Sequence, residues 1–230
     1  YKRQVIYIGD ENEGYTAAHM AGIDEMAANL GLSDDQIIEK TTIPEDESCY
    51  DAAVDLADQG CNIIFATSFG HETYILQAAQ EYPDIQFCHA TGTQAASSGL
   101  SNMHNYFDSI YEARYVSGVV AGMKLNGMIA DGTITEDTAK IGYVGAFPYA
   151  EVISGFTSFY LGAKSQCPSA TMEVQYTNSW ADMSGEAEVA AKLIDDGCVL
   201  ISQHADTTGA PSTCEDKKVC LLYTSPSPRD

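Results

Sequence analysis

Basic residues are scarce in this chain of 230 residues, which has 11 Lys and Arg against 33 Asp and Glu and a formal net charge of −22. Binding to nucleic acid depends on Lys and Arg contacts to phosphates, and attachment to anionic membranes depends on the same side chains. We therefore expect no nucleic acid among the partners. We interpret the acidic excess as a solubilising surface, with attraction of cationic ligands as the alternative.

Long apolar segments are also missing. No run reaches about 18 residues, the length that a membrane-spanning helix needs. The chain begins with Tyr1-Lys-Arg-Gln-Val5, directly in a predicted strand and without an initiator Met or a signal peptide. We expect a further segment to precede it in the natural protein.

Common catalytic signatures are absent as well. The chain has no G-x-S-x-G elbow and no G-x-x-x-x-G-K-[ST] loop, and the segment from Gly9 to Gly14 lacks the G-x-G-x-x-G spacing. His204 and Asp206 have no third or fourth metal ligand at helical spacing. We predict no catalytic residue, no cofactor and no metal, although abundant acidic residues leave an acid–base carboxylate pair open.

Cysteines are present without the spacing of a motif. The seven are odd in number and form no C-x-x-C pair. Cys61, Cys88 and Cys198 lie in or beside apolar predicted strands, where a free thiol behaves as a small hydrophobic group. A short loop closed by Cys214 and Cys220 is the alternative for two of the others.

Strand and helix patterns alternate along the chain, which predicts parallel, doubly wound sheets with right-handed crossovers. The first series predicts strands over 5–9, 36–42, 62–67 and 85–90 and helices over 15–29, 49–59 and 72–81, with Gly31 after the first helix and Ser48 as the N-cap of the second. The second series predicts helices over 110–125, 149–165, 182–196 and 211–216 and strands over 140–146, 171–176, 198–203 and 218–222. We interpret 126–138 as a polar surface excursion.

These two series predict an α/β protein with two doubly wound parallel-sheet lobes. We expect an N-terminal lobe over residues 1–107, a C-terminal lobe over 108–220, and a ligand crevice between them. Residues 221–230 have no periodicity and resemble translated vector sequence, so we interpret them as a non-native tail.

The first lobe carries candidate ligand contacts where its strands end. Open α/β sheets hold ligands outside the carboxyl ends of their strands, and an aromatic ring there contributes about 1–3 kcal/mol by stacking on a planar base. Alternatives are a helix-dipole role for the acidic residue and a rim position for the tyrosine. The candidates are Asp10, Tyr15, Thr16, Ser68 and Phe69.

The second lobe has a matching set after its own strands. Trp180 is the single tryptophan and follows the strand over 171–176, while Phe147 follows the strand over 140–146. His204 and Asp206 close the next strand, and we expect them to hydrogen bond to the ligand. We expect Trp180 to face Tyr15 or Phe69 across the crevice and to sandwich a planar ligand.

Several segments together resemble the basic membrane protein family of solute-binding lipoproteins that serve ABC transporters, over about Val5 to about Val219. The segments are Gly9–His19, Phe65–His71, Glu81–Asp84, Cys88–Gly92, Tyr111–Gly118, Lys140–Gly145, Tyr176–Trp180 and Gln203–Asp206. Tyr15 stands where relatives often have Trp. The resemblance implies a type I periplasmic-binding-protein fold whose second lobe is incomplete, because the match stops before the family's usual end.

The same resemblance implies a function. It is that of an extracytoplasmic receptor that binds a purine nucleoside or nucleobase and presents it to the membrane subunits of an ABC importer. We expect a monomer, anchored to the plasma membrane by an N-terminal lipid outside this chain. A small-molecule-sensing domain of a regulator and an enzyme that acts on nucleosides are the alternatives.

Overall fold

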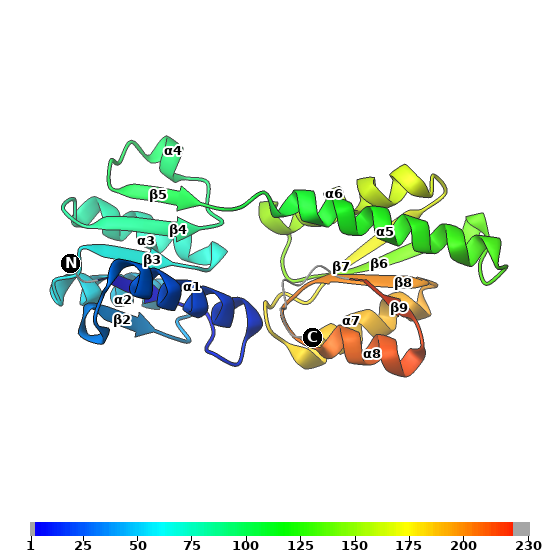
Figure 1. The fold of residues 1–230 in the computed structure, drawn as a ribbon, viewed down its shortest axis with the longest axis horizontal. Helices are drawn as coiled ribbons and strands as arrows, with labels where there is room; N and C mark the ends of the chain where they lie inside the picture. The colour runs from blue at the N-terminus through cyan, green and yellow to red at the C-terminus, as the bar shows by residue number, and fades with distance from the viewer. Residues whose placement is uncertain (1–2, 223–230) are drawn as a thin grey trace. The chain divides into compact units, whose positions relative to one another are not determined.

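The computed structural model describes residues 3–222. The chain forms two compact units, Tyr1–Asp108 and Ser109–Asp230 (Figure 1). Each unit contains one parallel sheet with helices on both faces, so the predicted α/β class with two doubly wound sheets is confirmed. The predicted tail over 221–230 lies outside the described residues except for Leu221 and Leu222.

The first unit is built on a five-stranded parallel sheet with the order β2-β1-β3-β4-β5. Its strands are β1 (Arg3–Ile6), β2 (Ile37–Lys40), β3 (Ile63–Ala66), β4 (Gln86–Ala90) and β5 (Met103–Tyr106). Its helices are α1 (Gly14–Leu30), α2 (Glu47–Asp58), α3 (Glu72–Glu81) and the short α4 (Ala95–Ser98). Figure 1 shows α1 on the opposite face of this sheet from α2 and α3.

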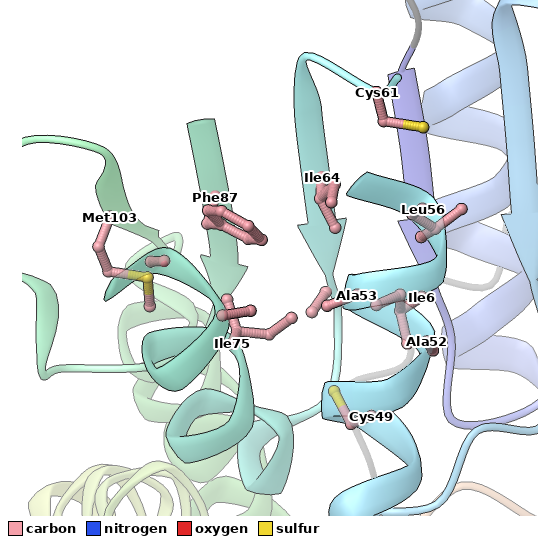
Figure 2. Close-up of a cluster of buried hydrophobic side chains, with 13 residues drawn as sticks. Ile6, Cys49, Ala52, Ala53, Leu56, Cys61, Ile64, Ile75, Phe87 and Met103 are labelled. Carbon is pink, nitrogen blue, oxygen red and sulfur yellow. The ribbon is translucent and has the colours of Figure 1, made fainter. Parts of the chain in front are cut away.

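The core of the first unit lies between the sheet and α2 and α3 (Figure 2). Ile64 and Phe87 project from the strands onto Leu56 of α2 and Ile75 of α3, and all four side chains have no exposed surface. Small residues of α2, such as Ala53, let this helix lie close to the strands. Burial of such side chains contributes about 1.5–3 kcal/mol each and is the main stabilising term here.

The helix ends show one prediction confirmed and one wrong. Gly31 ends α1 with a left-handed φ of 64°, and its N–H bonds back to the carbonyls of Ala27 and Ala28. Ser48 is not the N-cap of α2, because the Asp46 carboxylate accepts from the backbone N–H of Ser48 at 2.9 Å and so occupies that role. A carboxylate is favoured at this position since the helix dipole is positive there.

The second unit has a four-stranded parallel sheet with the order β7-β6-β8-β9. Its strands are β6 (Lys140–Gly145), β7 (Thr171–Tyr176), β8 (Leu200–His204) and β9 (Cys220–Leu221). Its helices are α5 (Ile110–Ala130), α6 (Ala150–Gln166), α7 (Met183–Asp195) and α8 (Gly209–Lys217). The pair α5 and α6 covers one face and the pair α7 and α8 covers the other.

Helix α5 is longer than predicted. The expected surface excursion over 126–138 begins inside it, since the helix continues to Ala130. Leu125 is fully buried, and Ile129, one turn later on the same face, packs against the same cluster. The polar residues around Asn126 and Gly127 hid this periodicity because they lie on the exposed face of the helix.

Helices α5 and α6 approach each other through glycines. A Cβ atom at Gly118 would overlap the carbonyl oxygen of Phe159, and one at Gly162 would overlap the carbonyl oxygen of Tyr115. The two backbones therefore touch where the helices cross. This contact fixes α5 and α6 as one layer over the sheet.

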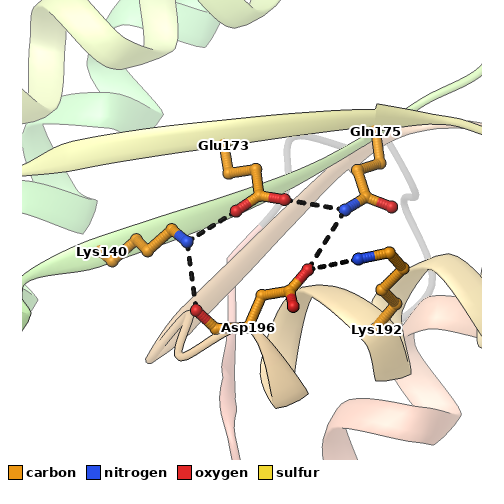
Figure 3. Close-up of polar contacts among 5 residues, drawn as sticks. All are labelled: Lys140, Glu173, Gln175, Lys192 and Asp196. Carbon is orange, nitrogen blue, oxygen red and sulfur yellow. Dashed lines mark hydrogen bonds and ion pairs between the residues drawn. The ribbon is translucent and has the colours of Figure 1, made fainter.

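A polar network joins Lys140 at the start of β6, two residues of β7 and the end of α7 (Figure 3). Lys140 forms a 2.6 Å ion pair with Glu173, and Lys192 forms one of 2.6 Å with Asp196. Gln175 bridges the two carboxylates through its Nε2. The side chains of both ion pairs are partly exposed, so each pair adds only about 0–1 kcal/mol.

The structure also bears on membrane insertion and on disulfide bonds. No helix between residues 3 and 222 is both long enough and apolar enough to cross a membrane. All seven cysteines, Cys214 and Cys220 included, are free thiols.

The glycine contact yields a test of this packing. Gly118→Ala should destabilise the chain by about 3 kcal/mol or more, because the added methyl overlaps backbone that cannot move aside. Gly127→Ala on the same helix should be neutral or stabilising by up to about 1 kcal/mol, since nothing lies within 4 Å of its Cβ position. Urea unfolding of both variants measures the difference, and equal stabilities would contradict the close approach.

Candidate functional site

The carboxyl ends of the strands in the first unit surround the turn over residues 67–71. Tyr15 donates its hydroxyl to the Thr67 carbonyl at 2.6 Å, and His89 Nε2 lies 2.7 Å from the Ser68 carbonyl. His71 Nε2 lies 2.9 Å from the carbonyl of Ile43. Side chains from separate elements thus hold one short turn in place.

Glu45 fastens the same turn from the loop after β2. Its Oε1 accepts from the Ser68 hydroxyl at 2.6 Å and from the Gly70 N–H at 2.7 Å. A Cβ at Gly70 would lie 2.5 Å from the carboxyl carbon of Glu45, so a larger residue there would displace this side chain. Sequence reasoning missed Glu45, because nothing local to it indicates a partner more than 20 residues away.

The predicted residues of the first unit fall into two groups. Tyr15 and Phe69 are half-buried, and the Tyr15 ring meets His19 edge-on at 4.5 Å. Thr16 and Ser68 are buried: Thr16 accepts from the Gly9 N–H at 3.3 Å, and Ser68 donates to Glu45. The structure brings Tyr15, Ser68 and Phe69 to the 67–71 turn.

Asp10 lies in the loop that follows β1. Its carboxylate accepts from the backbone N–H of Asn12 at 2.9 Å and from the Asn12 side chain at 3.1 Å. These bonds shape the loop that leads into α1. The predicted contact of Asp10 with a ligand stays a prediction.

An aromatic cluster lies after the strands of the second unit. The rings of Phe147 and Tyr149 stack with centroids 4.8 Å apart and planes 13° apart. Trp180 lies 5.3 Å from Phe147 and 6.0 Å from Tyr149, with its plane tilted to both. All three are half-buried. Tyr149 was missed from the sequence, although an aromatic residue two positions after Phe147 in the same loop was an available signal.

The end of β8 holds the two loops that carry this aromatic cluster. The backbone N–H of Ala146 donates to the His204 carbonyl at 3.1 Å, just before Phe147. The backbone N–H of Asp206 donates to the Trp180 carbonyl at 2.8 Å. Four of the predicted residues, Phe147, Trp180, His204 and Asp206, therefore come together at one edge of the second sheet.

His204 is buried, with 8% of its surface exposed. Its Nε2 lies 3.0 Å from Oε1 of Glu151. Burial lowers the pKa of His204, against the opposing effect of the Glu151 carboxylate. Because a carboxylate only accepts hydrogen bonds, the ring donates from Nε2 to Glu151.

Strained backbone occurs just after the carboxyl ends of strands in both units. Thr42, Thr91 and Asn178 have left-handed φ values of 55°, 67° and 57°, and each follows a strand by one or two residues. Such conformations cost about 1–3 kcal/mol for residues other than glycine, and they concentrate at ligand sites. Their positions agree with function at the carboxyl ends of the strands.

A shallow hollow also lies on the second unit, between the N-terminal parts of α7 and α8. Asp182, Met183, Ser212 and Thr213 are among its lining residues, and no predicted ligand residue lines it. Among residues 3–222, no group of three or more His, Cys, Asp and Glu side chains is arranged to hold a metal ion. The predicted contact of Trp180 with Tyr15 or Phe69 joins two separate units and stays a prediction.

Two doubly wound units with parallel sheets have the fold of the type I periplasmic-binding proteins. Comparison with known proteins narrows this class to a family. Residues 8–218 match the family model described as Bmp, ABC transporter substrate-binding protein PnrA-like. The chain therefore belongs to this family, as its sequence motifs predicted.

Named relatives and a solved structure agree with this assignment. A purine-binding protein of Brucella abortus is 35% identical over 93% of this chain, which covers 57% of that protein. TsgA13 of Haloferax volcanii is 38% identical over 69% of this chain, which covers 37% of that protein. Its name describes it provisionally as an ABC transporter glucose-binding protein. An ABC transporter solute-binding protein from Aeropyrum pernix has the same fold, with a TM-score of 0.79, 16% identity and coverage of 96% and 61%. The chain thus spans less than two thirds of each.

A buried glutamate next to the loop after β8 predicts how the stability of the chain depends on pH. Glu186 of α7 has no exposed surface and accepts from the backbone N–H of Thr207 at 3.0 Å. Burial raises the pKa of Glu186 above its ordinary value of 4.5. Folding therefore favours the protonated form of Glu186. The stability that this protonation contributes is fully present at low pH and is lost as the pH rises through the folded-state pKa.

Glu186→Gln should therefore gain stability relative to the parent chain as the pH is raised from about 4.5 to about 8. Thermal unfolding across that range measures the gain. Glu188→Gln, an exposed glutamate on the same helix, is the matched control and should leave the profile unchanged. Parallel profiles for Glu186→Gln and the parent chain would contradict the burial argument.

Proposed function

We propose that the chain is the ligand-binding part of an ABC importer's receptor and that its ligand is a purine nucleobase or nucleoside. The observation that carries the proposal is the aromatic cluster of Phe147, Tyr149 and Trp180 at the carboxyl edge of the second sheet. The family of ABC transporter substrate-binding proteins and the purine-binding relative from Brucella abortus support it.

Stacking on this cluster supplies the apolar part of the binding energy. A base stacked on an aromatic side chain gains about 1–3 kcal/mol. Backbone bonds to His204 and Asp206 already hold the loops that carry the rings, so little ordering of these loops is needed on binding. Asp206 lies beside Trp180 and supplies a carboxylate for an exocyclic amine or a ribose hydroxyl.

The first unit adds contacts through its preorganised turn. Tyr15 and Phe69 are half-buried and are the proposed aromatic contributors, while Asp10 contributes its carboxylate. Thr16 and Ser68 are buried and already hydrogen bonded within the unit, so we propose that they act chiefly by shaping the turn.

A sugar is the second candidate ligand. The provisional glucose-binding role of the Haloferax volcanii relative favours it, and aromatic rings stack on sugar faces as well as on bases.

The transport role follows from the family. We propose that the protein acts outside the cytoplasmic membrane as a monomer, held there by an N-terminal lipid, and presents its ligand to the membrane subunits of an ABC transporter. Membership in a family of substrate-binding proteins disfavours the regulator and enzyme alternatives. The net charge of −22 disfavours nucleic acid as a partner.

Calorimetric titration with adenine, adenosine and glucose tests the proposal. We expect a purine to bind and Trp180→Ala to weaken it by at least tenfold, about 1.4 kcal/mol, through loss of stacking. Tyr160→Ala is the matched control, because this aromatic residue of the same unit bonds to the Ala170 carbonyl away from the cluster.

Three outcomes contradict parts of the proposal. Binding of glucose alone would keep the family and replace the ligand. Purine binding that Trp180→Ala leaves unchanged would remove the aromatic cluster from the site. Equal losses from Trp180→Ala and Tyr160→Ala would show a general effect on folding.

A further inference from the structure

The short segment His204–Asp206 connects to both loops that carry aromatic rings. The His204 carbonyl accepts from Ala146, the residue before Phe147, and the Asp206 N–H donates to the carbonyl of Trp180. These are backbone bonds, which any sequence could form. The side chain of His204 adds a third connection that depends on its chemistry.

The His204 imidazole is directed at helix α6. Its Nε2 lies 3.0 Å from Oε1 of Glu151, which belongs to the first turn of α6. Tyr149 is the N-cap residue of this helix, two positions before Glu151. Any shift of the first turn therefore moves Tyr149 and the Phe147 ring stacked on it.

A second contact with α6 lies one turn further along. A Cβ at Gly155 would come within 2.9 Å of His204 Nδ1, so the helix approaches the ring as closely as glycine allows. Glu151 and Gly155 are four residues apart and share one face of α6. Together they fix both the distance and the rotation of this helix relative to β8.

The bond between His204 and Glu151 is largely shielded from solvent. His204 is 8% exposed, and the side chain of Glu151 is 12% exposed. Arg114 of α5 is also buried and donates from Nη1 to the Gln203 carbonyl at 3.0 Å. Without His204, the Glu151 carboxylate would be buried without this hydrogen bond. Breaking the pair therefore carries a large free-energy penalty.

We propose that His204 and Glu151 are positioning residues of the ligand site, whose hydrogen bond holds the first turn of α6 so that Phe147 and Tyr149 stay aligned beside Trp180. Neither residue needs to touch the ligand for this role. The inference rests on the proposed function for its affinity readout alone, because the alignment of the rings can be measured without any ligand.

The ligand-free test uses Trp180, the single tryptophan of the chain. Glu151→Ala should raise the acrylamide quenching constant of Trp180 about twofold, since the loosened rings no longer shield it. Glu151→Gln keeps an oxygen acceptor for His204 and should restore quenching close to the parent value. Ile129→Ala, a partly buried residue at the far end of α5, lowers stability without touching this pair and should leave quenching unchanged.

The affinity test uses adenine with the same variants. Glu151→Ala should weaken binding about tenfold through misplacement of the rings, Glu151→Gln should recover most of it, and Ile129→Ala should bind as the parent chain does. Quenching and affinity of Glu151→Ala equal to the parent values would overturn the proposal, as would equal losses in Ile129→Ala. Failure of the parent chain to bind adenine would count against the proposed function, while the quenching arm would still decide the positioning role.

Discussion

Parallel pairing of the strands is the constraint that gathers the candidate ligand residues in each unit. In each sheet every strand runs in the same direction, so every strand delivers its following loop to the same edge. Loops from distant parts of the sequence then meet there. The close glycine contact of α5 with α6 and the buried apolar layer under α2 and α3 keep the sheets rigid enough for these loops to have one geometry.

Acidic side chains give the loops that geometry. Glu45, Asp46, Glu72, Asp182 and Glu186 each accept hydrogen bonds from backbone N–H groups at turns or helix starts. A carboxylate is well suited to this task because it accepts several strong bonds and complements the positive end of a helix. The acidic excess, interpreted from the sequence as a solubilising surface, thus also has a structural part.

Local signals predicted most of the fold and part of the site. The alternation of strand and helix patterns gave the α/β class, and a glycine after a periodic run located the end of α1 at Gly31. Phe147 and Trp180 were predicted because each follows a strand, and the structure brings them within 5.3 Å. Glu45 and Glu151 were missed since their partners lie far away in sequence, and the end of α5 was misplaced because polar residues occupy its exposed face.

Fluorescence of Trp180 during titration with adenine tests the central claim most directly. The chain has no other tryptophan, so its emission reports on the aromatic cluster alone. If a purine stacks on this cluster, the emission should change saturably with adenine, with the same dissociation constant that calorimetry gives, and should not change with glucose. Calorimetric binding of adenine without any change in Trp180 emission would place the ligand elsewhere and contradict the account.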